Sequence, residues 1–145
     1  LQLVPDLDTD ATLICTPHQG ELAKMGGPRE SDWRIRRDAL EKFAAEIGHT
    51  LLVKGRYDLV SDGDRTRANR TGNPGMTVGG TGDVLAGVTG ALAAEHEPIH
   101  AAGLGAFITG RAGDIVAREW GAGLLATDLI DAIPQAMNRN TRDER

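Results

Sequence analysis

The chain of 145 residues is long enough for one compact domain with a hydrophobic core and too short for two domains of ordinary size. Its net charge of -5 argues against nonspecific binding to nucleic acid or to anionic membranes, and we expect neither as a partner. We find neither an apolar run of about 18 residues nor a secretory leader, and the single cysteine fits a reducing compartment, so we expect a cytoplasmic protein.

The first half of the sequence predicts short strands that alternate with helices. Ser31 or Asp32 is placed to cap the second helix, and Gly48 is placed to end it. Strands are predicted at 12–16, 50–55, 58–61 and 67–69, and helices at 18–25 and 33–47.

The second half predicts three helices, at 81–95, at 100–120 and from residue 127 onward. Strand, helix and strand followed by a run of helices predict an α/β fold with a mostly parallel sheet that helices cover on both faces. These strands are few for a doubly wound sheet. We therefore expect residues 1–145 to be the C-terminal portion of a single domain whose N-terminal half is absent.

The segment "HEPIH" at 96–100 formally matches the zinc-protease pattern, which requires both histidines to lie one turn apart on a helix. Pro98 disfavours a helix there, so we expect a loop between two helices and predict no metal site. In the helix that follows, we attribute the glycines to close packing in the core; they are Gly103, Gly105, Gly110 and Gly113.

The stretch "NPGMTVGGTGDVLAG" at 73–87 combines several glycines with a single carboxylate, Asp83. The glycines allow positive φ angles and close approach of a ligand, and residues 81–83 lie where the free amides of a starting helix point outward. With the helix dipole, this predicts an anion site for a transferring phosphoryl group or an oxyanion, formed by Gly80, Thr81 and Gly82. Asp83 is then the catalytic base or orienting group for a substrate hydroxyl; the alternative is that it merely caps the helix.

General motifs do not identify this stretch, because it lacks the Gly-Lys-Ser/Thr of the P-loop and the third glycine of the dinucleotide fingerprint. Three blocks in their order along the chain, "TPHQGELAKM", "LLVKG" and "TGNPGMTVGGTGDVLAG", nevertheless resemble the carbohydrate-kinase-like domain of ADP-dependent NAD(P)H-hydrate dehydratases. The resemblance implies a ribokinase-like fold and a repair reaction in which hydrated NADH or NADPH is dehydrated with ADP or ATP. It implies phosphoryl transfer to the ring hydroxyl and elimination, with Mg²⁺ accompanying the phosphates.

The resemblance also assigns roles to individual residues. Asp83 would face the hydrated substrate, His18 would contact it, and Gly82 would lie against the nucleotide. The nucleotide-binding segment would consist of Lys54, Gly55, Arg56, Tyr57 and Asp58. In the family the Lys-Gly pair usually continues with small residues and a threonine, so the bulkier residues here leave the choice between ADP and ATP open.

The residues themselves leave several alternatives. His18 follows a predicted strand, where open α/β sheets bind ligands, but a histidine that caps the next helix also fits. Tyr57 either stacks on a base or simply packs beside its strand. As a whole, the chain is alternatively a small-molecule kinase of the same superfamily or a non-catalytic nucleotide-binding or structural fragment. We expect a homo-oligomer or association with the missing N-terminal half.

Overall fold

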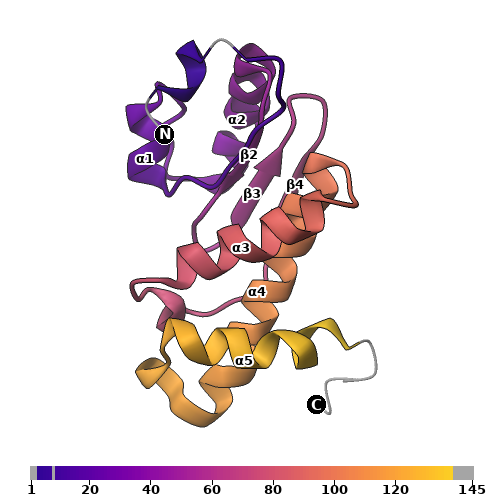
Figure 1. Ribbon diagram of the computed structural model, residues 1–145. Coiled ribbons are helices and arrows are strands. Elements are labelled where there is room, and N and C mark those ends of the chain that lie inside the picture. The colour runs from indigo at the N-terminus through magenta and orange to yellow at the C-terminus, as the bar shows by residue number, and fades with distance from the viewer. Residues whose placement is uncertain (1–2, 8, 139–145) are drawn as a thin grey trace.

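The computed structural model describes residues 3–7 and 9–138. Four strands and five α-helices are interspersed with three short 3-10 turns in the described part of the chain (Figure 1). Their order is η1 (Val4–Asp6), β1 (Ile14–Cys15), α1 (Gln19–Lys24), α2 (Trp33–Ile47), β2 (Thr50–Val53), β3 (Asp58–Ser61), β4 (Thr66–Asn69), η2 (Pro74–Met76), α3 (Thr81–Ala93), α4 (Pro98–Trp120), η3 (Gly121–Gly123) and α5 (Ala126–Met137).

The described strands form one sheet in the order β1-β2-β3-β4. β1 pairs with β2 in parallel, whereas β2 with β3 and β3 with β4 are antiparallel. The expectation of a mostly parallel sheet is therefore wrong for these four strands. The reason is connection length, because the short links at 54–57 and 62–65 only allow the chain to double back, while a parallel pair needs a longer crossover such as α1 and α2.

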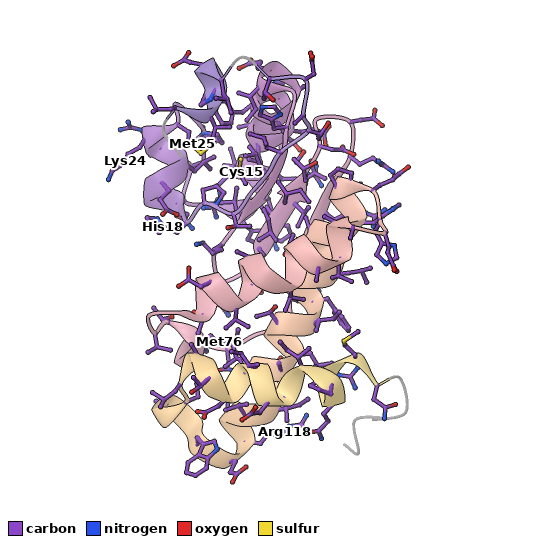
Figure 2. All side chains as sticks on the ribbon, in the orientation of Figure 1. Cys15, His18, Lys24, Met25, Met76 and Arg118 are labelled. Carbon is purple, nitrogen blue, oxygen red and sulfur yellow. The ribbon has the colours of Figure 1, made fainter. Side chains whose placement is uncertain are left out.

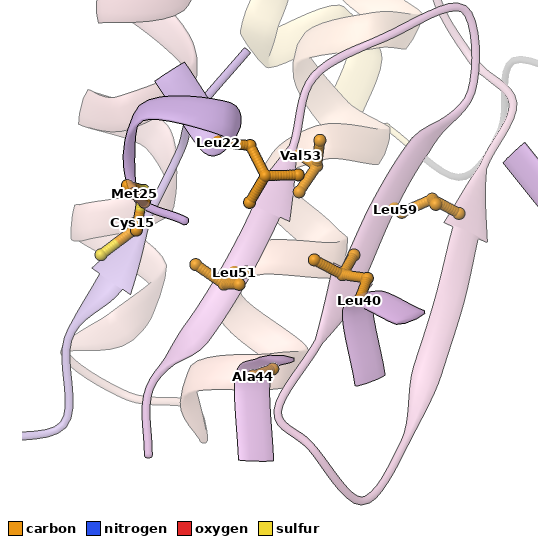
Figure 3. Close-up of a cluster of buried hydrophobic side chains, with 8 residues drawn as sticks. All are labelled: Cys15, Leu22, Met25, Leu40, Ala44, Leu51, Val53 and Leu59. Carbon is orange, nitrogen blue, oxygen red and sulfur yellow. The ribbon is translucent and has the colours of Figure 1, made fainter. Parts of the chain in front are cut away.

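Successive side chains of β2 and β3 point to opposite faces of the sheet, and both faces are covered. One face packs under α1 and α2, and Figure 3 shows its buried cluster of Cys15, Leu22, Met25, Leu40, Ala44, Leu51, Val53 and Leu59. The other face packs against α3 and α4 through Leu52, Val60, Leu85, Ile99, Ala102 and Ala106. The predicted α/β architecture with helices on both faces is thus confirmed.

Helix boundaries follow their capping residues. Of the two candidate caps, Asp32 caps α2, since its Oδ1 accepts a hydrogen bond of 2.7 Å from the Arg34 amide. Gly48 ends α2 with a φ of 68°. α4 begins at Pro98, so the predicted start at His100 is corrected: proline suits the first helical position, where its missing N–H costs no hydrogen bond.

Two glycines let α4 lie close against the segment before α3. A Cβ at Gly110 would overlap Thr71, and a Cβ at Gly113 would overlap Met76. Close packing is confirmed for these glycines, whereas the space beside Gly103 is open. Within the described residues, no helix combines the length and apolarity that a membrane span requires.

Candidate functional site

The amino-terminal end of α3 presents backbone amides at the predicted anion site. Gly80 turns the chain into the helix with a φ of 94°, and its carbonyl accepts from the amides of Asp83 (3.0 Å) and Val84 (3.1 Å). The amides of Thr81 and Gly82 precede these first bonds of the helix. The expectation that the Asp83 amide is also free is therefore corrected, because that amide already donates to Gly80.

The Thr81 side chain braces the loop instead of facing a ligand. Its hydroxyl is within hydrogen-bonding distance of two carbonyl oxygens, Met76 O at 2.9 Å and Val78 O at 3.0 Å. Thr81 thus offers its backbone amide to the anion site, while its hydroxyl fixes the turn that precedes the helix.

Lys54 brings a positive charge to the same place. It follows β2, and its amide donates to Pro17 O at 2.8 Å, which extends the pairing of β1 with β2. Its Nζ lies 3.3 Å from the point where a Cβ of Gly82 would stand. An ammonium group and the positive end of a helix dipole therefore converge on Gly82, which is the arrangement that binds phosphate oxygens.

Asp83 is exposed in the first turn of α3, next to these groups. Among the described residues, no side chain caps this end of the helix with a hydrogen bond. Asp83 nevertheless lies in the first turn, where its charge suits the positive end of the helix dipole, so a role in helix stability and a role toward a substrate both stay open for its exposed carboxylate.

His18 caps α1, as the alternative interpretation expected. Its Nδ1 accepts from the Glu21 amide at 3.1 Å, and Glu21 Oε2 accepts from the His18 amide at 2.7 Å. Figure 2 shows the imidazole at the surface end of α1, and its side chain is 61% exposed. Because Nδ1 is occupied as an acceptor, a contact of His18 with substrate would have to use Nε2.

Glu21 connects His18 with Lys54. Its Oε2 lies 3.7 Å from His18 Nε2 and 3.8 Å from Lys54 Nζ. The hydrogen bond from the His18 amide, with smaller contributions from the charges of Lys54 and His18, holds the pKa of Glu21 below its ordinary value. The ion pair of Glu21 with Lys54 follows from the parallel pairing of β1 with β2, which places Lys54 beside the start of α1.

Asp58 closes the loop at 54–58. Its Oδ1 accepts from the Gly55 amide at 3.1 Å and its Oδ2 from Asn69 Nδ2 at 3.0 Å. Burial raises the pKa of Asp58, although these hydrogen bonds and the charge of Lys54 oppose the shift. Both oxygens are thus engaged within the protein, and the part that Asp58 plays here is to shape the loop that carries Lys54 and Gly55.

Aromatic rings and arginines gather beside this loop. The ring centroids of Tyr57 and Trp33 are 5.3 Å apart with the planes tilted by 55°, so Tyr57 packs as the second interpretation expected. Arg56 and Arg70 lie 5.8 and 6.0 Å from the Tyr57 ring, and Arg34 lies 4.9 Å from the Trp33 ring. No local sequence pattern predicts that Trp33, Arg34 and Arg70 gather near Tyr57.

A hollow of about 460 Å³ lies away from these groups, between β3, β4 and α4. Its lining consists of Val60, Arg67, Ala68, Asn69, His96, His100, Gly103, Leu104 and Phe107. It contains neither Asp83 nor Lys54, whereas a positive charge, backbone amides and an exposed acid meet at the start of α3, which is therefore the candidate site. In the described part of the chain, no three His, Cys, Asp or Glu side chains are grouped to hold a metal.

Comparison with known proteins gives consistent matches. A family model described as NAD(P)H-hydrate dehydratase matches residues 4–135. The bifunctional NAD(P)H-hydrate repair enzyme Nnr of Methanospirillum hungatei is 47% identical over 136 residues, which cover 90% of this chain and 27% of that protein. The ADP-dependent (S)-NAD(P)H-hydrate dehydratase of Cenarchaeum symbiosum is 41% identical over 126 residues, which cover 86% of this chain and 44% of that protein.

Two solved structures share the fold over 90% of this chain. The ADP/ATP-dependent NAD(P)H-hydrate dehydratase of Bacillus subtilis, co-crystallized with ATP and Mg²⁺, matches with a TM-score of 0.80 at 29% identity over 48% of its own length. A ribokinase-like superfamily protein of Enterococcus faecalis matches with a TM-score of 0.75 at 27% identity over 46% of its own length. The chain spans less than half the length of each of these four proteins. Because the family model covers most of its residues, this chain has the predicted ribokinase-like fold and belongs to the NAD(P)H-hydrate dehydratase family.

Proposed function

We propose that the protein of which this chain is all or part dehydrates hydrated NADH and NADPH with ADP or ATP as phosphoryl donor. The observation that carries the proposal is the meeting of three features at Gly82: the Lys54 ammonium, the free amides of α3 and the exposed Asp83 carboxylate. The names of the relatives support the same reaction.

In this reaction Asp83 accepts the proton of the ring hydroxyl as the hydroxyl oxygen forms its bond to phosphorus. Lys54 and the amides of Thr81 and Gly82 stabilise the charge on the phosphoryl oxygens. The bond between this phosphorus and the bridging oxygen of the nucleotide breaks, and the nucleotide departs with one phosphoryl group fewer. The phosphorylated oxygen is then expelled by the lone pair of the ring nitrogen, and loss of a proton from the neighbouring ring carbon restores the dihydropyridine.

The nucleotide would lie along the loop at 54–58 and against Gly82. The glycine backbone allows close approach, and the Arg56 and Arg70 guanidiniums beside Tyr57 supply positive charge for the nucleotide. Because the described side chains form no metal cluster of their own, Mg²⁺ would enter with the nucleotide phosphates, as it commonly does. His18 Nε2 is the atom that we assign to substrate contact.

We further propose that residues 1–145 form part of one ribokinase-like domain and that another strand pairs with the outer edge of β1. Among the described strands β1 pairs only with β2, and such an edge offers free backbone groups to another segment. The partner is the rest of the domain or a second copy of this chain. The buried, unpaired Cys15 supports a cytoplasmic location.

The test is recovery of the NADH absorbance band from hydrated NADH in the presence of ADP and Mg²⁺. We expect recovery from the chain, or from a version extended by the upstream half of a relative, and a loss of about 10²- to 10⁴-fold in rate for Asp83→Asn, the usual contribution of a general base. Asp131→Asn, an equal charge change at an exposed position of α5, serves as the matched control.

Product analysis separates the proposal from its alternatives. A kinase of the superfamily would leave a phosphorylated alcohol and no recovered NADH, whereas the dehydratase releases phosphate. If the extended version produces neither, the protein is not a dehydratase, and a non-catalytic role becomes the better interpretation.

A further inference from the structure

A carboxylate of α4 holds the turn that precedes the anion site. Asp114 is partly buried, and each of its oxygens accepts a hydrogen bond from this turn. Its Oδ2 accepts from the Gly72 amide at 2.9 Å, and its Oδ1 accepts from Asn73 Nδ2 at 3.0 Å. Asp114 thus fixes two successive residues of a segment 41 positions away in the chain.

Asn73 passes this constraint to the 3-10 turn η2. Its side-chain Oδ1 accepts from the Gly75 amide at 3.0 Å, and its carbonyl accepts from the Met76 amide at 3.1 Å. The Asn73 side chain therefore works at both ends: its amide nitrogen binds α4, and its oxygen caps the turn. Rotation of this side chain would break both contacts.

The 3-10 turn η2 supports the start of α3. Met76 O accepts from the Thr81 hydroxyl, and the Met76 side chain packs against Gly113, one residue before Asp114. A continuous series of hydrogen bonds consequently runs from Asp114 through Asn73 and η2 to Thr81, whose amide belongs to the anion site.

We infer that Asp114 is a positioning residue, which sets the position of the Thr81 and Gly82 amides without touching the ligand. The identity of the ligand, ADP, rests on the proposed function, whereas the hydrogen bonds from Asp114 to the turn do not depend on it. A carboxylate is needed because two donors, Gly72 N–H and Asn73 Nδ2–H, face position 114. An amide there would set its own NH₂ group against one of these donors.

This pairing allows a swap experiment with Asp114→Asn, Asn73→Asp and the double variant. In Asp114→Asn, the new NH₂ group at 114 faces the NH₂ group of Asn73, so two donors meet. In Asn73→Asp, the new carboxylate at 73 faces the carboxylate of Asp114, so two acceptors meet. In the double variant the new amide at 114 accepts from Gly72 and donates to the new carboxylate at 73, which still accepts from Gly75. Every hydrogen bond is then restored, and only between positions 73 and 114 are donor and acceptor exchanged.

Two readouts are compared, hydrogen exchange and affinity for ADP with Mg²⁺. We expect each single variant to speed exchange of the Gly75, Met76, Asp83 and Val84 amides and to weaken ADP binding about tenfold, the cost of one charged hydrogen bond. The double variant should return both quantities to within about threefold of the unsubstituted protein. Asp131→Asn, with the same change of charge, should alter neither.

Unchanged exchange and affinity in Asp114→Asn would overturn the inference, as would a double variant no better than the singles. If a single variant fails to fold, recovery of folding and ADP binding in the double variant supports the inference, and failure to recover refutes it. If neither the unsubstituted chain nor its extended version binds ADP, the proposed function fails, while the exchange rates of the folded variants still decide the role of Asp114.

Discussion

Replacement of Lys54 by methionine removes the ammonium group beside Gly82 and keeps a side chain of similar length. Two charges about 4 Å apart near a protein surface interact by about 4 kcal/mol, and exposure of the Lys54 side chain, 30%, reduces this. A charge-assisted hydrogen bond contributes about 1.5–3 kcal/mol, which we take as the loss. The dissociation constant for ADP should therefore rise about 10- to 150-fold in Lys54→Met.

The assay is calorimetric titration of ADP with Mg²⁺ into the unsubstituted protein, Lys54→Met and Lys24→Met. Lys24 is the control, because it is also a lysine, lies exposed at the end of α1 and is labelled in Figure 2. Folding stability should change by at most about 1 kcal/mol, since the contact of Lys54 with Glu21 is long and partly exposed. Unchanged affinity in Lys54→Met, or an equal loss in Lys24→Met, would refute the placement of a phosphate at Gly82.

Three further predictions concern the stability of the fold and the coupling of η2 to the candidate site. In Gly63→Ala the new Cβ would lie 2.5 Å from Ala45 Cα at a φ of 92°, so thermal unfolding should show a loss of about 1–3 kcal/mol; an unchanged melting temperature would contradict this. The hydrogen bond from the His18 amide holds the pKa of Glu21 below its ordinary value, so the Glu21 charge stabilises the fold above that ordinary value and this contribution disappears as pH falls through the lower folded pKa. Urea unfolding of Glu21→Gln should therefore differ from that of the unsubstituted protein at neutral pH and converge with it in acid; an equal difference at both would contradict this. Gly113→Ala would push a methyl group into Met76, and we expect a lower melting temperature together with weaker ADP binding; unchanged ADP affinity would show that η2 is not coupled to the site.

Much of the fold and part of the site could be predicted from local sequence. The helix start at Asp32, its end at Gly48 and the start of α3 at Thr81 all depend on φ angles and capping groups within a few residues. For the same reason the sequence indicated an anion site near Gly80, and its family blocks indicated Asp83. The local sequence did not decide the role of Tyr57, because packing in the protein and stacking on a base use the same aromatic ring.

Only the tertiary structure decided which distant residues meet. The antiparallel order of β2, β3 and β4 and the packing of α3 against the sheet bring Lys54 to Gly82, and α4 brings Asp114 to Asn73. No local pattern marks these pairs, because each contact depends on sheet order and helix packing set by the whole hydrophobic core. The sequence by itself therefore determined the turns, caps and glycines of the proposed phosphate site, whereas long-range packing decided which charge faces that site and which carboxylate bonds to the turn before it.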